Sequence, residues 1–191
     1  MKRHRRIWII FCLLIWQAAV PYLLHAQLLP GAAAEPITAD QVRESIDGGV
    51  KYLLEQQNAN GTWNDLAPYP GGVTALCTLA LLNSGVESGH PQIQKALRYL
   101  RDIEPSKTYS VSLQTMVFCA AEPERDRLLI ERNVKWLEDH QIRDGAQAGM
   151  WAIPTLGTPD HVDNSMTHMA MLALYDAERI GVTATDETWQ L

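Results

Sequence analysis

QQNANGTW, residues 56–63, reads as the end of one helix, a glycine turn and a tryptophan, and a similar passage follows later in the chain. VKYLLEQQNANGTW at residues 50–63 matches VKWLEDHQIRDG at residues 134–145, and Trp151 follows soon after. LRYL at residues 97–100 echoes the first four letters without the glutamine and tryptophan. Recurrence at intervals of tens of residues is typical of repeat proteins, so it predicts one structural unit used several times.

Hydrophobic spacing predicts helices and no sheet. Thr38 and Gln41 fit a capping box at the start of the first helix, and Pro91 suits the first position of the third. No segment alternates with a period of two residues, so no strand is expected. The expected helices are 38–57, 73–82, 90–105, 110–121, 125–140 and 164–180, with 182–191 starting a seventh capped by Thr185 or Asp186.

The six helices alternate between two kinds. The first, third and fifth carry charges on one face, whereas the second, fourth and sixth are apolar on nearly all sides and resemble one another: VTALCTLALL, VSLQTMVFCA and MTHMAMLALY. A helix with one polar face belongs on a surface, and one without it belongs between neighbours. The alternation predicts an all-α fold of about three helical hairpins, with an inner row covered by an outer row.

The spacing Gln-x-x-x-Gly-x-Trp, present as Gln57, Gly61 and Trp63, resembles the repeat signature of squalene–hopene cyclases, oxidosqualene cyclases and protein prenyltransferase subunits. The second copy departs from the signature, because Gln141 and Gly145 are in place but four extra residues precede Trp151. DNSMTHMAMLALYDAERIGV, residues 163–182, also resembles this family, and its secreted bacterial repeat proteins in particular.

The likeness covers residues 40–191 and implies an α/α toroid of helical hairpins. The family closes roughly six hairpins into a ring, so about three hairpins would form an incomplete ring. The chain is therefore expected to be the first part of a toroid, or an arc that pairs with a second chain.

The physical role expected for the motif is structural. A glutamine offers donors and an acceptor to the groups left open at a helix end, glycine allows a tight turn, and tryptophan buries a large ring. Gln57, Gly61, Trp63, Gln141, Gly145 and Trp151 would thus fasten one hairpin to the next. Direct ligand contact is the alternative, and it is stronger for Trp151 because its loop is longer.

None of the family's catalytic motifs is found. Terpene cyclases use Asp-x-Asp-Asp or a magnesium-binding Asp-rich run, and protein prenyltransferases hold zinc with Asp, Cys and His. The nearest passage, Asp160-His161-Val162-Asp163, has the wrong spacing. No catalytic residue, metal or cofactor is therefore assigned.

Weaker candidates remain near the sixth helix. Asp160 and Asp163 are candidates for an acid/base pair like that of α/α-barrel glycosidases, although capping of the helix by residues 163–165 is favoured. His161 and His168 lie seven residues apart and could share a helix face as metal ligands. His168 is also a candidate for the concave face of the inner row, with a packed core histidine as the alternative.

Residues 1–26 differ from the rest of the chain. A basic start, an apolar run over residues 7–24 and a small Ala26 predict a secretory signal peptide, or an uncleaved membrane anchor with its basic end in the cytoplasm. Residues 27–37 read as a linker, and residues 38–191 as the repeat domain. A cleaved signal peptide would release the repeat domain outside the cytoplasm, and an uncleaved anchor would hold it at the cytoplasmic membrane. Export of the repeat domain is expected in both cases.

The charge of the chain bears on its possible partners, and the positions of its cysteines bear on whether it contains a disulfide. Residues beyond the leader carry 12 Lys and Arg against 22 Asp and Glu, a net of −10, which argues against nucleic acid. The mixed charges of residues 122–131 are expected on a solvated turn and outer face. Cys77 and Cys119 lie in apolar runs and read as buried small side chains, with a disulfide between them as the alternative.

The sequence therefore favours an exported binding or scaffold module without catalysis by this chain alone. Its expected partner is an apolar ligand such as an isoprenoid, or a second protein chain that completes the ring. The alternatives are a fragment of a terpene cyclase or prenyltransferase-like enzyme, and a carbohydrate-active α/α barrel.

Overall fold

The computed structural model describes residues 36–153, 161–162 and 164–191, and it divides the chain into two compact units, Met1–Arg43 and Glu44–Leu191. The predicted leader and most of the predicted linker lie outside the described residues. Within the described residues, no helix is both long enough and apolar enough to span a bilayer.

The first helix, α2 (Ala39–Gln56), begins with the predicted capping box. The Thr38 amide donates to Gln41 Oε1 at 2.9 Å, and the Gln41 amide donates to Thr38 Oγ1 at 3.2 Å. These bonds satisfy donors that a helix start leaves open.

The second unit is mostly helical, which confirms the all-α class. Its elements are α3 (Gly72–Asn83), α4 (Pro91–Arg101), α5 (Thr108–Ala121), α6 (Arg127–Asp139), the 3₁₀ turn η1 (Gly145–Gln147), β1 (Ala152–Ile153), β2 (His161–Val162), α7 (Asn164–Arg179) and α8 (Asp186–Gln190). The two strands pair antiparallel, with Ala152 opposite Val162, so the expectation of no strand was wrong. Two residues are too few for an alternating pattern to show.

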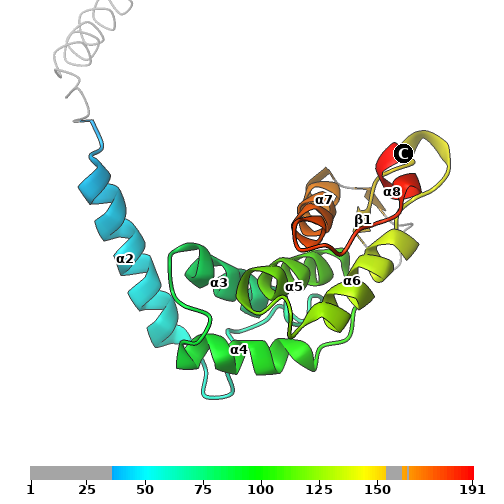
Figure 1. The fold of residues 1–191 in the computed structure, drawn as a ribbon. Coiled ribbons are helices and arrows are strands. Elements are labelled where there is room, and N and C mark those ends of the chain that lie inside the picture. The colour runs from blue at the N-terminus through cyan, green and yellow to red at the C-terminus, as the bar shows by residue number, and fades with distance from the viewer. Residues whose placement is uncertain (1–35, 154–160, 163) are drawn as a thin grey trace, which may run out of the picture. The chain divides into compact units, whose positions relative to one another are not determined.

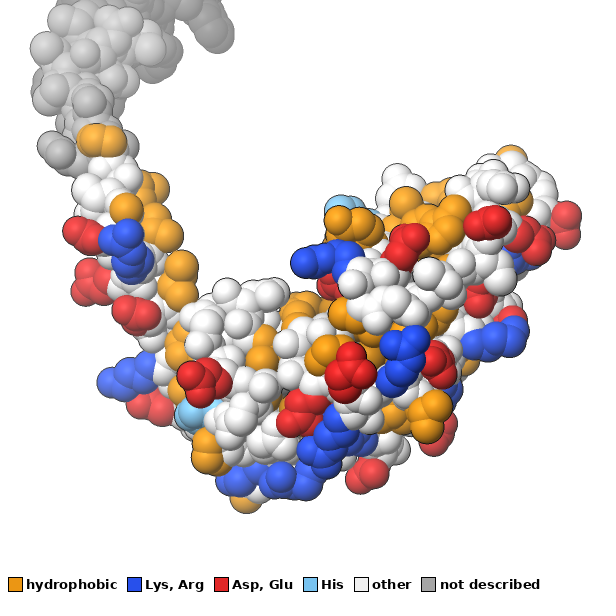
Figure 2. Space-filling view, in the orientation of Figure 1, with side chains coloured by type: hydrophobic (Ala, Val, Ile, Leu, Met, Phe, Trp, Pro, Cys, Tyr) orange, Lys and Arg blue, Asp and Glu red, His pale blue; other side chains and the backbone are white. Residues whose placement is uncertain are grey.

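Three apolar helices lie in a row, with α5 between α3 and α7 (Figure 1). α4 packs against α3, and α6 packs against α5 and α7. Residues 110–118 of α5 are all buried, as expected for a helix that is apolar on nearly all sides. Charged side chains gather over α4 and α6, where water covers them (Figure 2).

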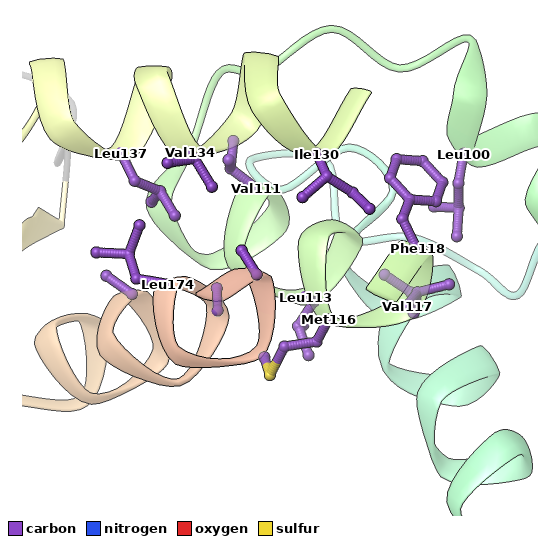
Figure 3. Packing of buried hydrophobic residues seen from close by; sticks show 14 of the residues in the cluster. Leu100, Val111, Leu113, Met116, Val117, Phe118, Ile130, Val134, Leu137 and Leu174 are labelled. Atoms are coloured by element: carbon purple, nitrogen blue, oxygen red, sulfur yellow. The ribbon is translucent and has the colours of Figure 1, made fainter. Parts of the chain in front are cut away.

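The core is one cluster of buried side chains to which α3, α4, α5, α6 and α7 all contribute. Leu100, Phe118, Ile130 and Leu174 come from α4, α5, α6 and α7, and each exposes at most 1% of its surface. Figure 3 shows part of this cluster, with Ile130, Phe118 and Leu100 near one another and Leu174 near Leu137. Burying a side chain of this size stabilises the fold by about 1.5–3 kcal/mol.

A charged cluster joins the end of α4 to the turn before α6. The Arg101 guanidinium donates to Asp126 Oδ1 at 2.7 Å and Oδ2 at 2.8 Å, and to Glu122 Oε2 at 2.6 Å. Asp126 is 2% exposed, so the expectation that residues 122–131 are solvated was wrong at this position. A two-pronged guanidinium–carboxylate pair is the arrangement that makes such burial tolerable.

Acid should weaken this cluster through Glu122. Burial alone would raise the pKa of Glu122, but hydrogen bonds from Gln94 and Arg101 and the charges of Arg101 and Arg125 outweigh it and lower that pKa. A carboxylate with a lowered pKa stabilises the fold above its ordinary pKa of about 4.3, and the contribution is lost as pH falls through the folded-state value. Between about pH 5 and pH 3, the wild type should therefore lose more stability than Glu122→Gln. Urea midpoints at each pH check this, and parallel declines in the two proteins would contradict it.

Candidate functional site

The first Gln–Gly–Trp motif joins the end of α2 to the starts of α3 and α4. Gln57 Nε2 donates to the Gly61 carbonyl at 3.0 Å and to the Gln92 carbonyl, in the first turn of α4, at 2.8 Å. Trp63 Nε1 donates to the Leu53 carbonyl of α2 at 3.0 Å, and the Trp63 amide donates to Thr74 Oγ1 of α3 at 3.2 Å. Three helices are therefore joined by the side chains of Gln57, Trp63 and Thr74 and by one turn.

The second motif repeats these contacts one for one. Gln141 Nε2 donates to the Gly149 carbonyl at 3.2 Å and to the Thr188 carbonyl of α8 at 3.1 Å. Trp151 Nε1 donates to the Leu137 carbonyl of α6 at 2.8 Å, and its amide donates to Thr167 Oγ1 of α7 at 3.1 Å. α6, α7 and α8 thus stand to one another as α2, α3 and α4 do at this junction.

The glycine of the second motif is Gly149 rather than Gly145. A Cβ on Gly61 would lie 2.6 Å from the Lys95 carbonyl carbon, and one on Gly149 would lie 2.7 Å from that of Leu191. Gly145 also has a positive φ, of 83°, but a Cβ there would meet nothing within 4 Å. The extra residues therefore lie before the motif glycine. The prediction that Gly145 is the motif glycine was wrong. It relied on the spacing of Gly145 from Gln141, which equals that of Gly61 from Gln57.

Between the two motifs, Gln114 donates the hydrogen bond that Trp63 and Trp151 donate in the first and second motifs. Residues 97–100 echo residues 50–53 and 134–137, so the carbonyls of Leu53, Leu100 and Leu137 hold equivalent places. Gln114 Nε2, from α5, donates to the Leu100 carbonyl at 2.7 Å and to the Ile103 carbonyl at 3.2 Å. Sequence reasoning missed this residue, although a glutamine inside an apolar helix is a signal of a buried hydrogen bond.

Gln114→Leu should lower the free energy of unfolding by about 1–3 kcal/mol, because it removes the buried amide that donates to the Leu100 and Ile103 carbonyls. These carbonyls then keep the Ile103 amide and the Arg132 guanidinium, respectively, as donors. Asn133 Nδ2, which donates to Gln114 Oε1 at 2.7 Å, also loses its acceptor. Denaturant unfolding followed by circular dichroism measures the change. Gln56→Leu, at an exposed position of α2, is the control and should change little. Equal effects of the two substitutions would contradict the role given to Gln114.

A shallow groove of about 470 Å³ runs between α7 and α8. Met171, Leu172, Tyr175 and Trp189 leave 48%, 41%, 56% and 40% of their surfaces in water, which is high for large apolar side chains. Contiguous exposed apolar surface marks interaction sites more often than scattered residues do. The groove is lined by Asn164, Thr167, His168, Met171, Leu172, Tyr175 and Trp189.

His168 lies on this groove and is exposed, so the core alternative was wrong for it. Asp160 and Asp163 lie outside the described residues, and nothing is shown of the His161 side chain. No carboxylate or cysteine belongs to the described residues that line the groove. In the described ranges, no group of three His, Cys, Asp or Glu side chains is placed to hold a metal ion.

Cys77 and Cys119 are partly buried free thiols. Cys119 lines a cavity of about 330 Å³ between the ends of α3, α5 and α7, together with Asp176 and Arg179. Burial, with a smaller contribution from the charge of Asp176, raises the pKa of the Cys119 thiol to about 12. A thiol with so high a pKa is a poor nucleophile at neutral pH.

Neither a model of a known protein family nor a curated protein matches this chain.

Proposed function

We propose that the chain is an exported helical-repeat protein of the squalene cyclase and prenyltransferase repeat kind, and that it is a binding or scaffold module. The repeat arrangement is supported by the two motifs, whose four hydrogen bonds correspond one for one. About three hairpins then form an arc of an α/α toroid. Export rests on the basic and apolar order of residues 1–26.

The observation that carries the binding role is the α7–α8 groove. Its wall is built from Met171, Leu172, Tyr175 and Trp189, all apolar or aromatic. Among the described residues, Asn164, Thr167 and His168 form its polar lining. Such a surface recognises an apolar partner, because contact removes this area from water at about 25 cal/mol per Å². We infer that the groove is the binding site of the module.

An environment-sensitive apolar dye, anilinonaphthalene sulfonate, tests this groove. The emission of dye bound to the full chain should fall when Met171→Asp and Tyr175→Asp are combined, with binding at the groove weakened at least about tenfold. Leu128→Asp changes an apolar residue that is 80% exposed on α6, so it is the matched control and should leave emission unchanged. Equal emission from the groove variant and the wild type would overturn the binding role.

A further inference from the structure

Among the described residues, the row formed by α3, α5 and α7 has an uncovered side at each end. α5 lies between α3 and α7, so α3 and α7 each have one side that α5 does not cover. The exposed face of α7 contains His168, Met171, Leu172 and Tyr175 at helical spacing. Asn164 and Ser165 are exposed in the first turn, and the face continues in the last turn to the exposed Glu178 and Arg179. On α3, Leu76 is 45% exposed and Ala80 is exposed, and Val73 and Cys77, on the same face, are partly buried.

The groove on α7 has a filled counterpart earlier in the chain. Thr167 and Thr188 take the places of Thr74 and Gln92 in the motif contacts, so Met171 corresponds to Thr78 and Trp189 to Ile93. Thr78 and Ile93 are fully buried. The same two helix positions are therefore covered in α3 and α4 but open in α7 and α8.

An apolar helix covers the earlier groove. α5 packs against α3, where a Cβ on Gly72 would lie 3.2 Å from atoms of Tyr109 and Ser110. α5 also reaches the end of α4 through Gln114 and the Leu100 carbonyl. The geometry thus indicates that an uncharged helix, apolar on its contact face, fits the groove between α7 and α8.

We propose that α3 of a second copy of this chain occupies the α7–α8 groove, so that copies associate head to tail. This proposal rests on the proposed function, since it names the partner of the same groove. α3 has the chemistry that the groove requires, because its sequence, GVTALCTLALLN, contains no charged residue. It is also uncovered on one side, as α7 is. One contact of α7 with α3 of the next copy therefore buries both exposed faces and extends the row in the order already present.

The contact costs little in desolvation. His168 and Tyr175 are the ionisable residues among the described residues that line the groove, and α3 contributes no ionised side chain. Glu178 and Arg179 lie at the end of α7, outside the groove lining, so a contact confined to the groove avoids the penalty of burying unpaired charges. Because the two surfaces differ, the association is heterologous, and each copy offers one face of each kind.

Two differently tagged copies of the full chain, expressed together, test the proposal. Capture of one tag should bring down the other copy. Met171→Asp in both copies, or Leu76→Asp in both, should reduce co-capture at least about tenfold, because each places a carboxylate in every junction. Leu128→Asp in both copies is the control and should leave co-capture unchanged. Thermal unfolding of each variant by circular dichroism shows that the fold persists.

The decisive arm mixes the two variants. A Met171→Asp copy still has an intact α3, and a Leu76→Asp copy still has an intact α7, so one junction between them is unchanged. Co-capture of this mixed pair should return toward the wild-type level. No recovery in the mixed pair would overturn the proposal. Loss of co-capture with Met171→Asp in both copies, but not with Leu76→Asp in both, would also overturn it, because that result indicates an α7–α7 contact.

The experiments distinguish a wrong choice of partner from a wrong assignment of the binding groove. If wild-type copies do not bring each other down while dye binding still depends on Met171 and Tyr175, the second copy is the wrong occupant and the binding groove stands. If dye binding is independent of both residues, the proposed function falls. In the Leu76→Asp variant α7 is intact, so dye binding should persist while co-capture is lost.

Discussion

Trp151→Ala should lower the free energy of unfolding by about 3–5 kcal/mol. The indole is 1% exposed and is among the largest fully buried side chains of the described residues. Its removal leaves a cavity and takes away a donor to the Leu137 carbonyl, to which the His140 amide also donates. Chemical denaturation of the full chain, followed by circular dichroism, measures the change.

Two further substitutions separate the causes of this loss. Trp151→Phe retains much of the apolar ring and removes the N–H, so we expect a smaller loss of about 1–3 kcal/mol. Trp189→Ala, at a position that is 40% exposed, should cost less than about 1 kcal/mol. A similar cost for Trp151→Ala and Trp189→Ala would show that the second motif does not hold the fold together.

Gly61→Ala should also lower the free energy of unfolding by a large amount. Gly61 has φ of 91°, where an L-residue costs roughly 1–2 kcal/mol, and the new Cβ would also lie 2.6 Å from the backbone of Lys95. A backbone neighbour cannot rotate away, so α4 must shift and the Gln57 bond to the Gln92 carbonyl is strained with it. We expect a total loss of about 3–5 kcal/mol, measured by the same unfolding experiment.

Gly145→Ala is the matched control, because Gly145 has φ of 83° and open space where a Cβ would be. It should cost roughly 1–2 kcal/mol, the conformational part alone. The difference between the two variants isolates the close approach of the chains. Losses of equal size would mean that positive φ alone explains the glycine of the motif.

The helices were predictable because each follows from local chemistry. Pro91 begins α4, where its missing N–H costs nothing, and the His90 ring accepts from the Gln92 amide at 3.3 Å. Residues 110–121 were expected between neighbours because they carry no charge, and α5 is buried along most of its length. Periodicity and caps are properties of adjacent residues, so a single sequence contains them.

The parts that were missed depend on distant residues. The sequence leaves Gly145 and Gly149 as alternatives, because Gly145 keeps the spacing of the motif from the glutamine and Gly149 keeps its spacing from the tryptophan. The approach of Leu191 decides for Gly149. The burial of Asp126 is decided by Arg101, which lies 25 residues earlier. The exposure of Met171 reflects which helices are neighbours rather than its own hydrophobicity, so the groove could not be read from the letters of α7.

The carbonyls of Leu53, Leu100 and Leu137 bear on how repeats of this kind are counted. A backbone oxygen cannot be lost by mutation, since every residue has one, whereas its donor is free to change from an indole to an amide on a different helix. Motif searches that look for glutamine and tryptophan therefore undercount such repeats. A structural search for the shared backbone acceptor, with any side-chain donor, would also recognise repeats such as the one at Leu100, which keep the hydrogen bond without the tryptophan.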